Sequence, residues 1–182
     1  MATAAKSAPS RITVPGNAGV KVVKACTIRA SAMELYRFWR DFNNLPKIIR
    51  HPVEITVLSD TESEWSVSAP FTDRRVTWRA TVINDKAPRL IAWRTTVNSE
   101  VPHAGSIRFE KAPGDEGTEV TVALEYDPPG GKLGGVLAKL SSDAPSRQVA
   151  DTLRRLKAWF EAGEIPTIDG QSAGEPQRSK RK

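Results

Sequence analysis

Between residues 51 and 127, large apolar side chains recur at every second position in short segments separated by turn-forming residues. A period of two with one apolar side is typical of antiparallel strands that bury one face. Residues 20–29 (VKVVKACTIR) show a similar β-branched pattern and predict a first strand. The strands from residue 51 on form three predicted hairpins: Val53-Ile55-Val57 with Trp65-Val67, Val76-Trp78-Ala80-Val82 with Ile91-Trp93, and Ile107-Phe109 with Val120-Val122-Leu124-Tyr126.

The turns set the expected register of these hairpins. Directly opposed residues share a face of a sheet, so each turn can be checked against the apolar pattern. The expected opposed pairs are Val57–Trp65 and Ile55–Val67 (turn near Asp60-Thr61), Trp65–Trp78 (turn at Phe71-Thr72), Ala80–Trp93 (turn at Asp85-Lys86-Ala87-Pro88), and Phe109–Val120 with Ile107–Val122 (turn at Pro113-Gly114-Asp115). All of them place the bulky residues on one side.

The other side of the sheet is predicted to face solvent because its residues are charged or polar. They are Arg75, Thr77, Arg79, Arg94, Arg108, Glu110, Glu119, Thr121 and Glu125. The expected register opposes Arg79 and Arg94, which is slightly unfavourable. We expect neighbouring glutamates to relieve this repulsion.

Helices are predicted before and after the hairpins. Ser31 and Glu34 fit a capping box at the start of a short helix. Its apolar stripe is Leu35, Phe38, Trp39 and Phe42, and Asn43-Asn44-Leu45-Pro46 interrupts it before a helical turn at Ile48-Ile49. A long amphipathic helix begins at Asp143-Ala144-Pro145, carries Val149, Leu153, Leu156 and Phe160 on one face, and ends at Gly163. Leu133, Leu137 and Leu140 allow a further short helical piece.

These elements predict an α+β fold, in which the apolar face of a curved antiparallel sheet of about seven strands is covered by the long C-terminal helix, with two short helices after the first strand. Residues 19–163 are the expected domain. Residues 1–18 and 164–182 are rich in Ala, Ser, Gly and Pro, and we expect a disordered N-terminal tail and a flexible basic C-terminal tail.

Composition excludes some functional classes. The formal net charge is +6 and the pI about 9.7, but part of the excess lies at the chain ends, so no specific nucleic-acid partner is expected. The basic tail is expected to give at most weak contact with a membrane surface. Cys26 is the single cysteine and cannot form an internal disulfide. No apolar run approaches the roughly 20 residues of a membrane span, so a cytoplasmic location is expected. The expected oligomeric state is a monomer or a weak dimer.

The chain resembles the START-like (Bet v 1-like, SRPBCC) superfamily, and within it the bacterial polyketide cyclase/dehydrase-type proteins. The resemblance runs from about residue 20 to residue 170. The segments that carry it are Tyr36–Pro46 (YRFWRDFNNLP), Ile91–Arg94 (IAWR), Gly105–Phe109 (GSIRF), Gly117–Val122 (GTEVTV), Tyr126–Gly131 (YDPPGG) and Gly163–Thr167 (GEIPT). It implies a helix-grip fold, in which the sheet wraps around the C-terminal helix, with an internal cavity. The superfamily includes lipid carriers, ubiquinone-binding proteins and aromatic-polyketide cyclases.

The inner face of this sheet and the facing side of the last helix are the predicted ligand cavity. Its expected lining is Ile55, Trp65, Val67, Trp78, Ala80, Ile91, Trp93, Ile107, Phe109, Val122, Leu124, Tyr126, Val149, Leu153 and Leu156. Trp65, Trp78 and Trp93 either form a stacking wall for a planar or polyisoprenoid ligand or simply fill the space under the helix. Both interpretations are open at this stage.

Catalytic candidates are few. Tyr126 at the end of the last strand either binds a ligand carbonyl or satisfies a backbone group. His51 and His103, the two histidines, are either proton carriers or surface residues. His103 and Tyr126 are the first candidates for catalysis. No metal-ligand spacing or cofactor motif occurs, so neither a metal site nor a cofactor is expected. Cys26 is expected to be a small core residue.

Three functions follow as hypotheses. The first is non-catalytic binding or transport of a hydrophobic small molecule such as a lipid, quinone or polyketide. The second is a polyketide cyclase or dehydratase that folds its substrate and moves a proton with one polar group. The third is an interaction module that uses the outer arginine stripe or the basic tail.

Overall fold

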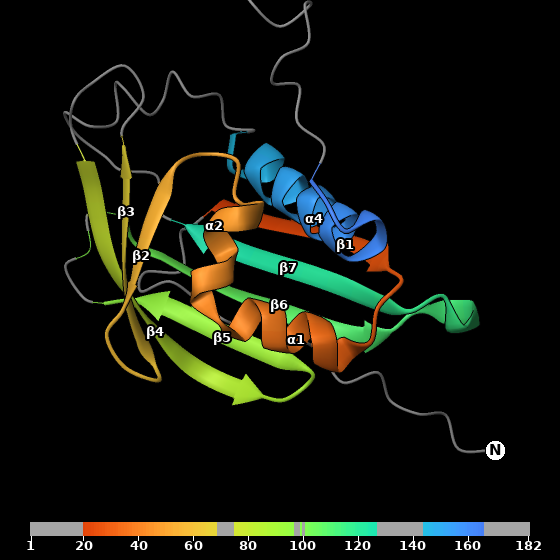
Figure 1. Ribbon diagram of the computed structural model, residues 1–182. Coiled ribbons are helices and arrows are strands. Elements are labelled where there is room, and N and C mark those ends of the chain that lie inside the picture. The colour runs from red at the N-terminus through yellow and green to blue at the C-terminus, as the bar shows by residue number, and fades with distance from the viewer. Residues whose placement is uncertain (1–19, 69–74, 97–98, 100, 127–143, 166–182) are drawn as a thin grey trace, which may run out of the picture.

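The computed structural model describes residues 20–68, 75–96, 99, 101–126 and 144–165 (Figure 1). In chain order the elements are β1 (Val20–Ile28), α1 (Ala32–Arg40), η1 (Phe42–Asn44), α2 (Leu45–Ile48), β2 (Val53–Val57), β3 (Glu62–Ser68), β4 (Arg75–Lys86), β5 (Leu90–Thr95), β6 (His103–Lys111), η2 (Pro113–Asp115), β7 (Thr118–Tyr126) and α4 (Ala144–Ala162). Within these ranges no helix is long and apolar enough to span a membrane.

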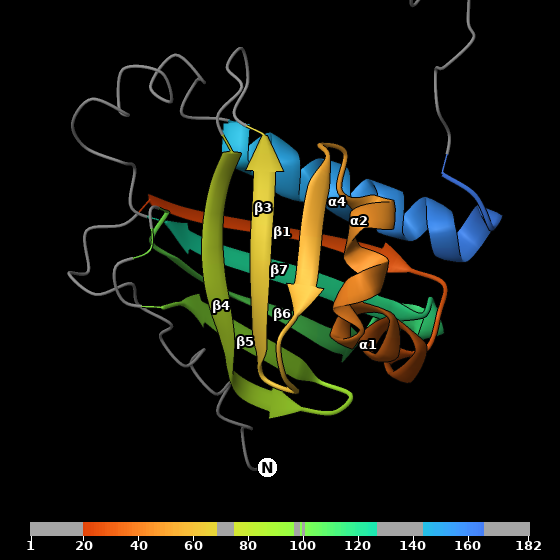
Figure 2. The ribbon, with the colours of Figure 1, turned by 60° about the vertical axis from the view of Figure 1, so that its left-hand side comes forward.

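The seven strands form one antiparallel sheet in the order β1-β7-β6-β5-β4-β3-β2. The sheet bends strongly, so that β2, β3 and β4 turn across β1, β6 and β7 (Figures 1 and 2). Helices α1 and α2 lie on the concave side, and α4 runs along β1. The predicted α+β helix-grip fold is confirmed.

Local sequence signals account for the start of α1 and the short helical pieces after it. Ser31 caps α1 through its side chain, and Glu34 bonds back to the Ser31 backbone N–H at 3.0 Å, completing the predicted capping box. Asp41 accepts from the backbone N–H of Asn43 at the start of η1. Pro46 sits in the first turn of α2, where a missing N–H costs nothing.

The core lies between the concave face of the sheet and the three helices. The side chains of Leu35, Tyr36 and Trp39 on α1 pack with Ile107 and Phe109 on β6. Leu153 and Leu156 join the same cluster from α4. Helix α4 is tied to β1 by Lys157 Nζ, which donates to the carbonyl oxygen of Thr27 at 2.6 Å. The predicted stripes of α1 and α4 therefore both face the core.

Two of the four predicted strand registers are confirmed. Trp65 pairs with Trp78, and Phe109 pairs with Val120 next to Ile107 with Val122. The expected single apolar face therefore exists across β3, β4, β6 and β7.

The predicted register of β2 and β3 was wrong by two residues. Ile55 faces Trp65, and Val53 faces Val67. The connection is longer than a tight turn, since Leu58 and Ser59 both donate their backbone N–H groups to the carbonyl oxygen of Glu62. A shift of two residues keeps every side chain on its expected face.

The predicted pairing of Ala80 with Trp93 was also wrong. Val82 faces Trp93, and Ala80 faces Thr95. The turn lies later than expected, at Lys86–Arg89. A bulge between Val82 and Asn84 shifts the register by one residue, so that Val82 and Trp93 are opposed and share a face. Bulges re-aim side chains. Here Asp85, opposite Ile91, is turned to the side of the sheet that α1 covers.

The outer face differs from the prediction at two points. Arg79 faces Glu64, with its Nε 3.0 Å from the carboxylate, and Arg94 faces Thr81, so the expected Arg79–Arg94 opposition was wrong. Glu125 is 5% exposed rather than solvated, and its Oε1 has no hydrogen-bond partner. Its neighbour Ala104 on β6 is also buried.

Some predictions concern residues outside the described ranges. They are the tail over residues 1–18, most of the tail over 164–182, the turn at Phe71-Thr72, and the helical piece at Leu133, Leu137 and Leu140. Gly163 follows α4 with a φ of +73°, as expected of a residue that ends a helix.

Candidate ligand-binding site

The residues predicted to line a cavity fall into two groups. The first is packed in the core: Ile91, Ile107 and Leu156 are 0% exposed, and Phe109 and Leu153 are 2% exposed. A side chain beside a hollow that admits water would keep accessible surface. The residues of this group are therefore packed core residues that stabilise the fold. Ala80 and Val122 are also buried.

The second group is only half-buried, and most of it lies toward the end of the sheet where β6 begins and β7 ends. It consists of Ile55, Trp65, Val67, Trp78, Trp93, Leu124, Tyr126 and Val149. Because these side chains retain accessible surface, this end of the concave face is the candidate site. Whether they enclose a ligand cavity remains a prediction.

Two indoles and an imidazole form a continuous aromatic wall in this group. The Trp65 and Trp78 rings stack at a centroid distance of 6.1 Å and an interplanar angle of 15°. The His103 ring meets Trp78 edge-on, at 5.7 Å and 81°. Trp65 is oriented further by its Nε1–H, which donates to Ser63 Oγ at 2.9 Å. We call Trp65, Trp78 and His103 the aromatic wall.

Trp93 shares this face but occupies a separate place. Its partner across the strand is Gly105, and an added Cβ at Gly105 would stand 2.7 Å from Cε2 of the indole. The ring therefore lies against the backbone of β6 at Gly105. The three indoles share a face, as predicted, but Trp93 is seated on glycine while the other two stack on each other.

His103 is held in one orientation. Its Nδ1 lies 2.9 Å from the carbonyl oxygen of Val101, and its backbone N–H donates to Thr95 Oγ1 at 3.1 Å. Burial lowers the pKa of His103, partly offset by the hydrogen bond to Val101. The ring is therefore neutral at pH 7.

Tyr126 lies directly across the strand from His103. The two catalytic candidates, 23 positions apart in the sequence, thus become immediate neighbours on the concave face. Within the described residues the Tyr126 hydroxyl makes no hydrogen bond, so both roles considered for it, binding a ligand carbonyl and satisfying a backbone group, stay predictions.

The structure separates the other candidate residues from this site. His51 is exposed in the segment before β2. Cys26 is half-buried against the core, where burial raises the pKa of its thiol. No group of three metal-ligating side chains occurs among the described residues.

A polar cluster that the sequence analysis missed joins α1 to the β4–β5 hairpin. The Tyr36 hydroxyl donates to Asp85 Oδ1, and Arg40 Nε lies 2.7 Å from Asp85 Oδ2. Burial and the hydrogen bond to Asp85 raise the pKa of Tyr36 to about 12. Tyr36 and Arg40 are 49 and 45 positions from Asp85 in the sequence, so no local pattern could have connected them to it. The cluster fixes α1 over the sheet.

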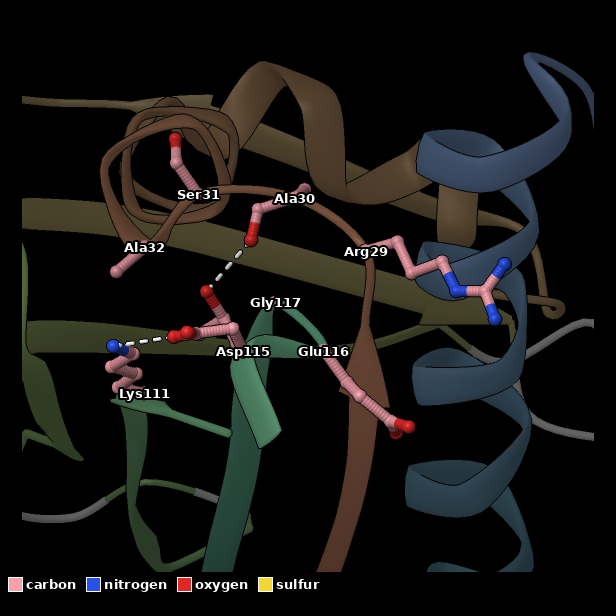
Figure 3. Close-up of a pocket in the computed structure, with 9 residues that line it drawn as sticks. Arg29, Ala30, Ser31, Ala32, Lys111, Asp115, Glu116 and Gly117 are labelled. Carbon is pink, nitrogen blue, oxygen red and sulfur yellow. Dashed lines mark hydrogen bonds and ion pairs between the residues drawn. The ribbon is translucent and has the colours of Figure 1, made fainter. Parts of the chain in front are cut away.

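A surface hollow of about 600 Å³ lies at the other end of the sheet, between the β1–α1 connection and the β6–β7 turn (Figure 3). Lys111 and Asp115 form an ion pair there at 2.5 Å, and Thr118 Oγ1 donates to the carbonyl oxygen of Ala30 at 2.7 Å. Arg29 extends away from that pair. No residue of the predicted cavity lines this hollow.

Residues 28–154 match the family described as polyketide cyclase / dehydrase and lipid transport. The chain belongs to this family. Among proteins with curated descriptions none matches the chain.

Solved structures share the fold. A protein from Deinococcus radiodurans is 34% identical, with a TM-score of 0.64 over 79% of this chain and 99% of that one. A protein from Thermus thermophilus is 21% identical, with a TM-score of 0.61 over 79% and 99%. The di-domain ARO/CYC protein StfQ of the steffimycin biosynthetic pathway is 14% identical, with a TM-score of 0.56 over 80% of this chain and 52% of that one. The last two likenesses concern the fold alone.

Proposed function

We propose that this family member binds a planar hydrophobic small molecule against the aromatic wall. The observation that carries the proposal is the stack of Trp65 on Trp78, continued by His103 and left half-buried beside a solid core. Aromatic rings that belong to a hydrophobic core are normally buried by other side chains of the protein. Rings that keep accessible surface on a concave face offer a ready surface for another ring.

Binding would be driven mainly by burial of apolar surface, at roughly 25 cal/mol per Å². A flat ring system would gain most, because it covers the exposed face of an indole over its whole area. The arginine stripe supports an interaction module less well, since Arg75 pairs with Glu54 and Arg79 with Glu64.

Isothermal titration calorimetry with 2-naphthol, oleate and a short-chain ubiquinone tests the proposal. Trp78→Ala should weaken binding at least fivefold, and Trp78 lies outside the buried core cluster, so the variant should fold. Trp159→Ala is the matched control, because Trp159 packs against Phe38 and Lys47 outside the wall. The proposal fails if no compound binds, or if the two variants lose affinity equally.

A second candidate function is a cyclase or dehydratase step on a polyketide-like substrate. The observation that favours it is the opposition of His103 and Tyr126, which offers a neutral imidazole beside a phenol for proton transfer. The likeness to StfQ supports the same possibility at the level of the fold. Unchanged cyclisation rates of a poly-β-ketone analogue in His103→Asn and Tyr126→Phe variants would exclude it.

A further inference from the structure

The tautomer of His103 is fixed by its neighbour. The carbonyl oxygen of Val101, 2.9 Å from Nδ1, can only accept a hydrogen bond. Nδ1 must therefore carry the proton. A neutral imidazole has a single N–H, so Nε2 carries a lone pair and acts only as an acceptor.

Nε2 is also without a protein partner among the described residues. Among the described residues, the buried side-chain polar atoms without a partner are Glu125 Oε1 and Arg155 Nε. His103 Nε2 and the Tyr126 hydroxyl are not of this kind, although neither forms a hydrogen bond within the same part of the chain. The His103 and Tyr126 side chains are both half-buried at the end of the aromatic wall.

We infer that the site selects planar ligands that carry a hydroxyl group, namely phenols and enols, because His103 Nε2 accepts the hydrogen bond that such a group donates. The inference rests on the proposed function, since it requires the ligand to lie on the aromatic wall. Tyr126, opposite His103, supplies a hydroxyl that can donate to an oxygen on the same ligand. An ether or a hydrocarbon of the same shape would cover the wall but leave Nε2 desolvated and unpaired.

A matched pair of probes isolates this hydrogen bond. 2-Naphthol and 2-methoxynaphthalene have the same ring system, and only the naphthol can donate. By calorimetry 2-naphthol should bind roughly tenfold more tightly than its methyl ether, the value of one well-formed hydrogen bond. Equal affinities would overturn the inference and leave the proposed function standing. If neither compound binds, both fail.

His103→Asn tests the residue. The asparagine amide can donate to Val101 in place of Nδ1, but it has no atom in the position of Nε2. The preference for the naphthol should fall from roughly tenfold to near one, whereas His51→Asn, at an exposed histidine, should retain it. A preserved preference in His103→Asn would contradict the assignment.

A measurement on the unmodified protein decides the matter if that variant does not fold. Nitrogen-15 NMR of the histidine side chains should show Nδ1 protonated and Nε2 unprotonated in His103 at about pH 7.5, where a neutral imidazole has one N–H. The Nε2 resonance should shift on addition of 2-naphthol and stay in place with 2-methoxynaphthalene. A proton on Nε2, or the same response to both compounds, would overturn the inference.

Discussion

Gly105 lies directly across from Trp93, and the indole covers the space that a side chain at Gly105 would occupy. Gly105→Ala should therefore push the indole off the sheet and lower the free energy of unfolding by about 1–3 kcal/mol, the usual cost of overpacking. Urea denaturation measures this change.

The double variant Gly105→Ala with Trp93→Leu supplies the control. Removing the indole removes the clash, so the two substitutions should cost less together than the sum of their separate effects. Strict additivity would show that Trp93 does not rest on Gly105.

The pKa of His103, lowered by burial, predicts acid sensitivity. Between the unfolded value of about 6.5 and the lower folded value, the unfolded chain binds a proton that the folded chain does not. Stability is therefore fully present above about pH 6.5 and falls as the pH drops below it. The free energy of unfolding, measured from about pH 7.5 to 5.5, should decrease with falling pH in the wild type and in His51→Gln. It should decrease less steeply in His103→Asn. Equal slopes in all three proteins would contradict the prediction.

The pKa of Tyr36, raised to about 12, predicts the opposite dependence at alkaline pH. An unfolded tyrosine ionises near pH 10, so the stability that Tyr36 contributes is intact below about pH 10 and is lost between about pH 10 and 12. At pH 8, Tyr36→Phe should cost about 1–2 kcal/mol through the lost hydrogen bond to Asp85. The difference in the free energy of unfolding between the variant and the wild type, measured by urea denaturation, should decrease as the pH rises toward about 12. A difference that does not change with pH would show that the Tyr36 hydroxyl ionises at the same pH in the folded and the unfolded protein.

Glu125 is a buried carboxylate with one unpartnered oxygen, which is costly. Glu125→Gln should raise the free energy of unfolding by about 1 kcal/mol at pH 7, because it removes a charge that burial disfavours. Glu119→Gln, on the same face of β7, is the control and should change stability by less than about 0.5 kcal/mol. A clear loss of stability in Glu125→Gln would show that the carboxylate is well paired in solution.

Features encoded locally were predictable from the sequence. The Ser31–Glu34 capping box and the leucines of α4 follow from spacing alone, and the turn at Pro113–Asp115 fixed the pairing of Phe109 with Val120. The register of β4 and β5 was not predictable in this way, because the bulge before Asn84 leaves no clear mark in the alternation.

The site was predictable in part. Alternation placed Trp65, Trp78 and Tyr126 on one face, but it could not distinguish a packed side chain such as Ile107 from one that keeps accessible surface. That distinction depends on where α1 and α4 press on the sheet. The tautomer of His103 depends on the carbonyl group of Val101, whose direction no sequence pattern reveals.

The central claim is that a planar ligand lies on the aromatic wall, and the five tryptophans can report on it in one titration. The indole N–H signals should be followed by NMR as 2-naphthol is added. Those of Trp65 and Trp78 should shift, while those of Trp39, buried in the core, and Trp159, outside the wall, should remain in place. Shifts confined to Trp39 or Trp159, or no shift at saturating 2-naphthol, would contradict the account.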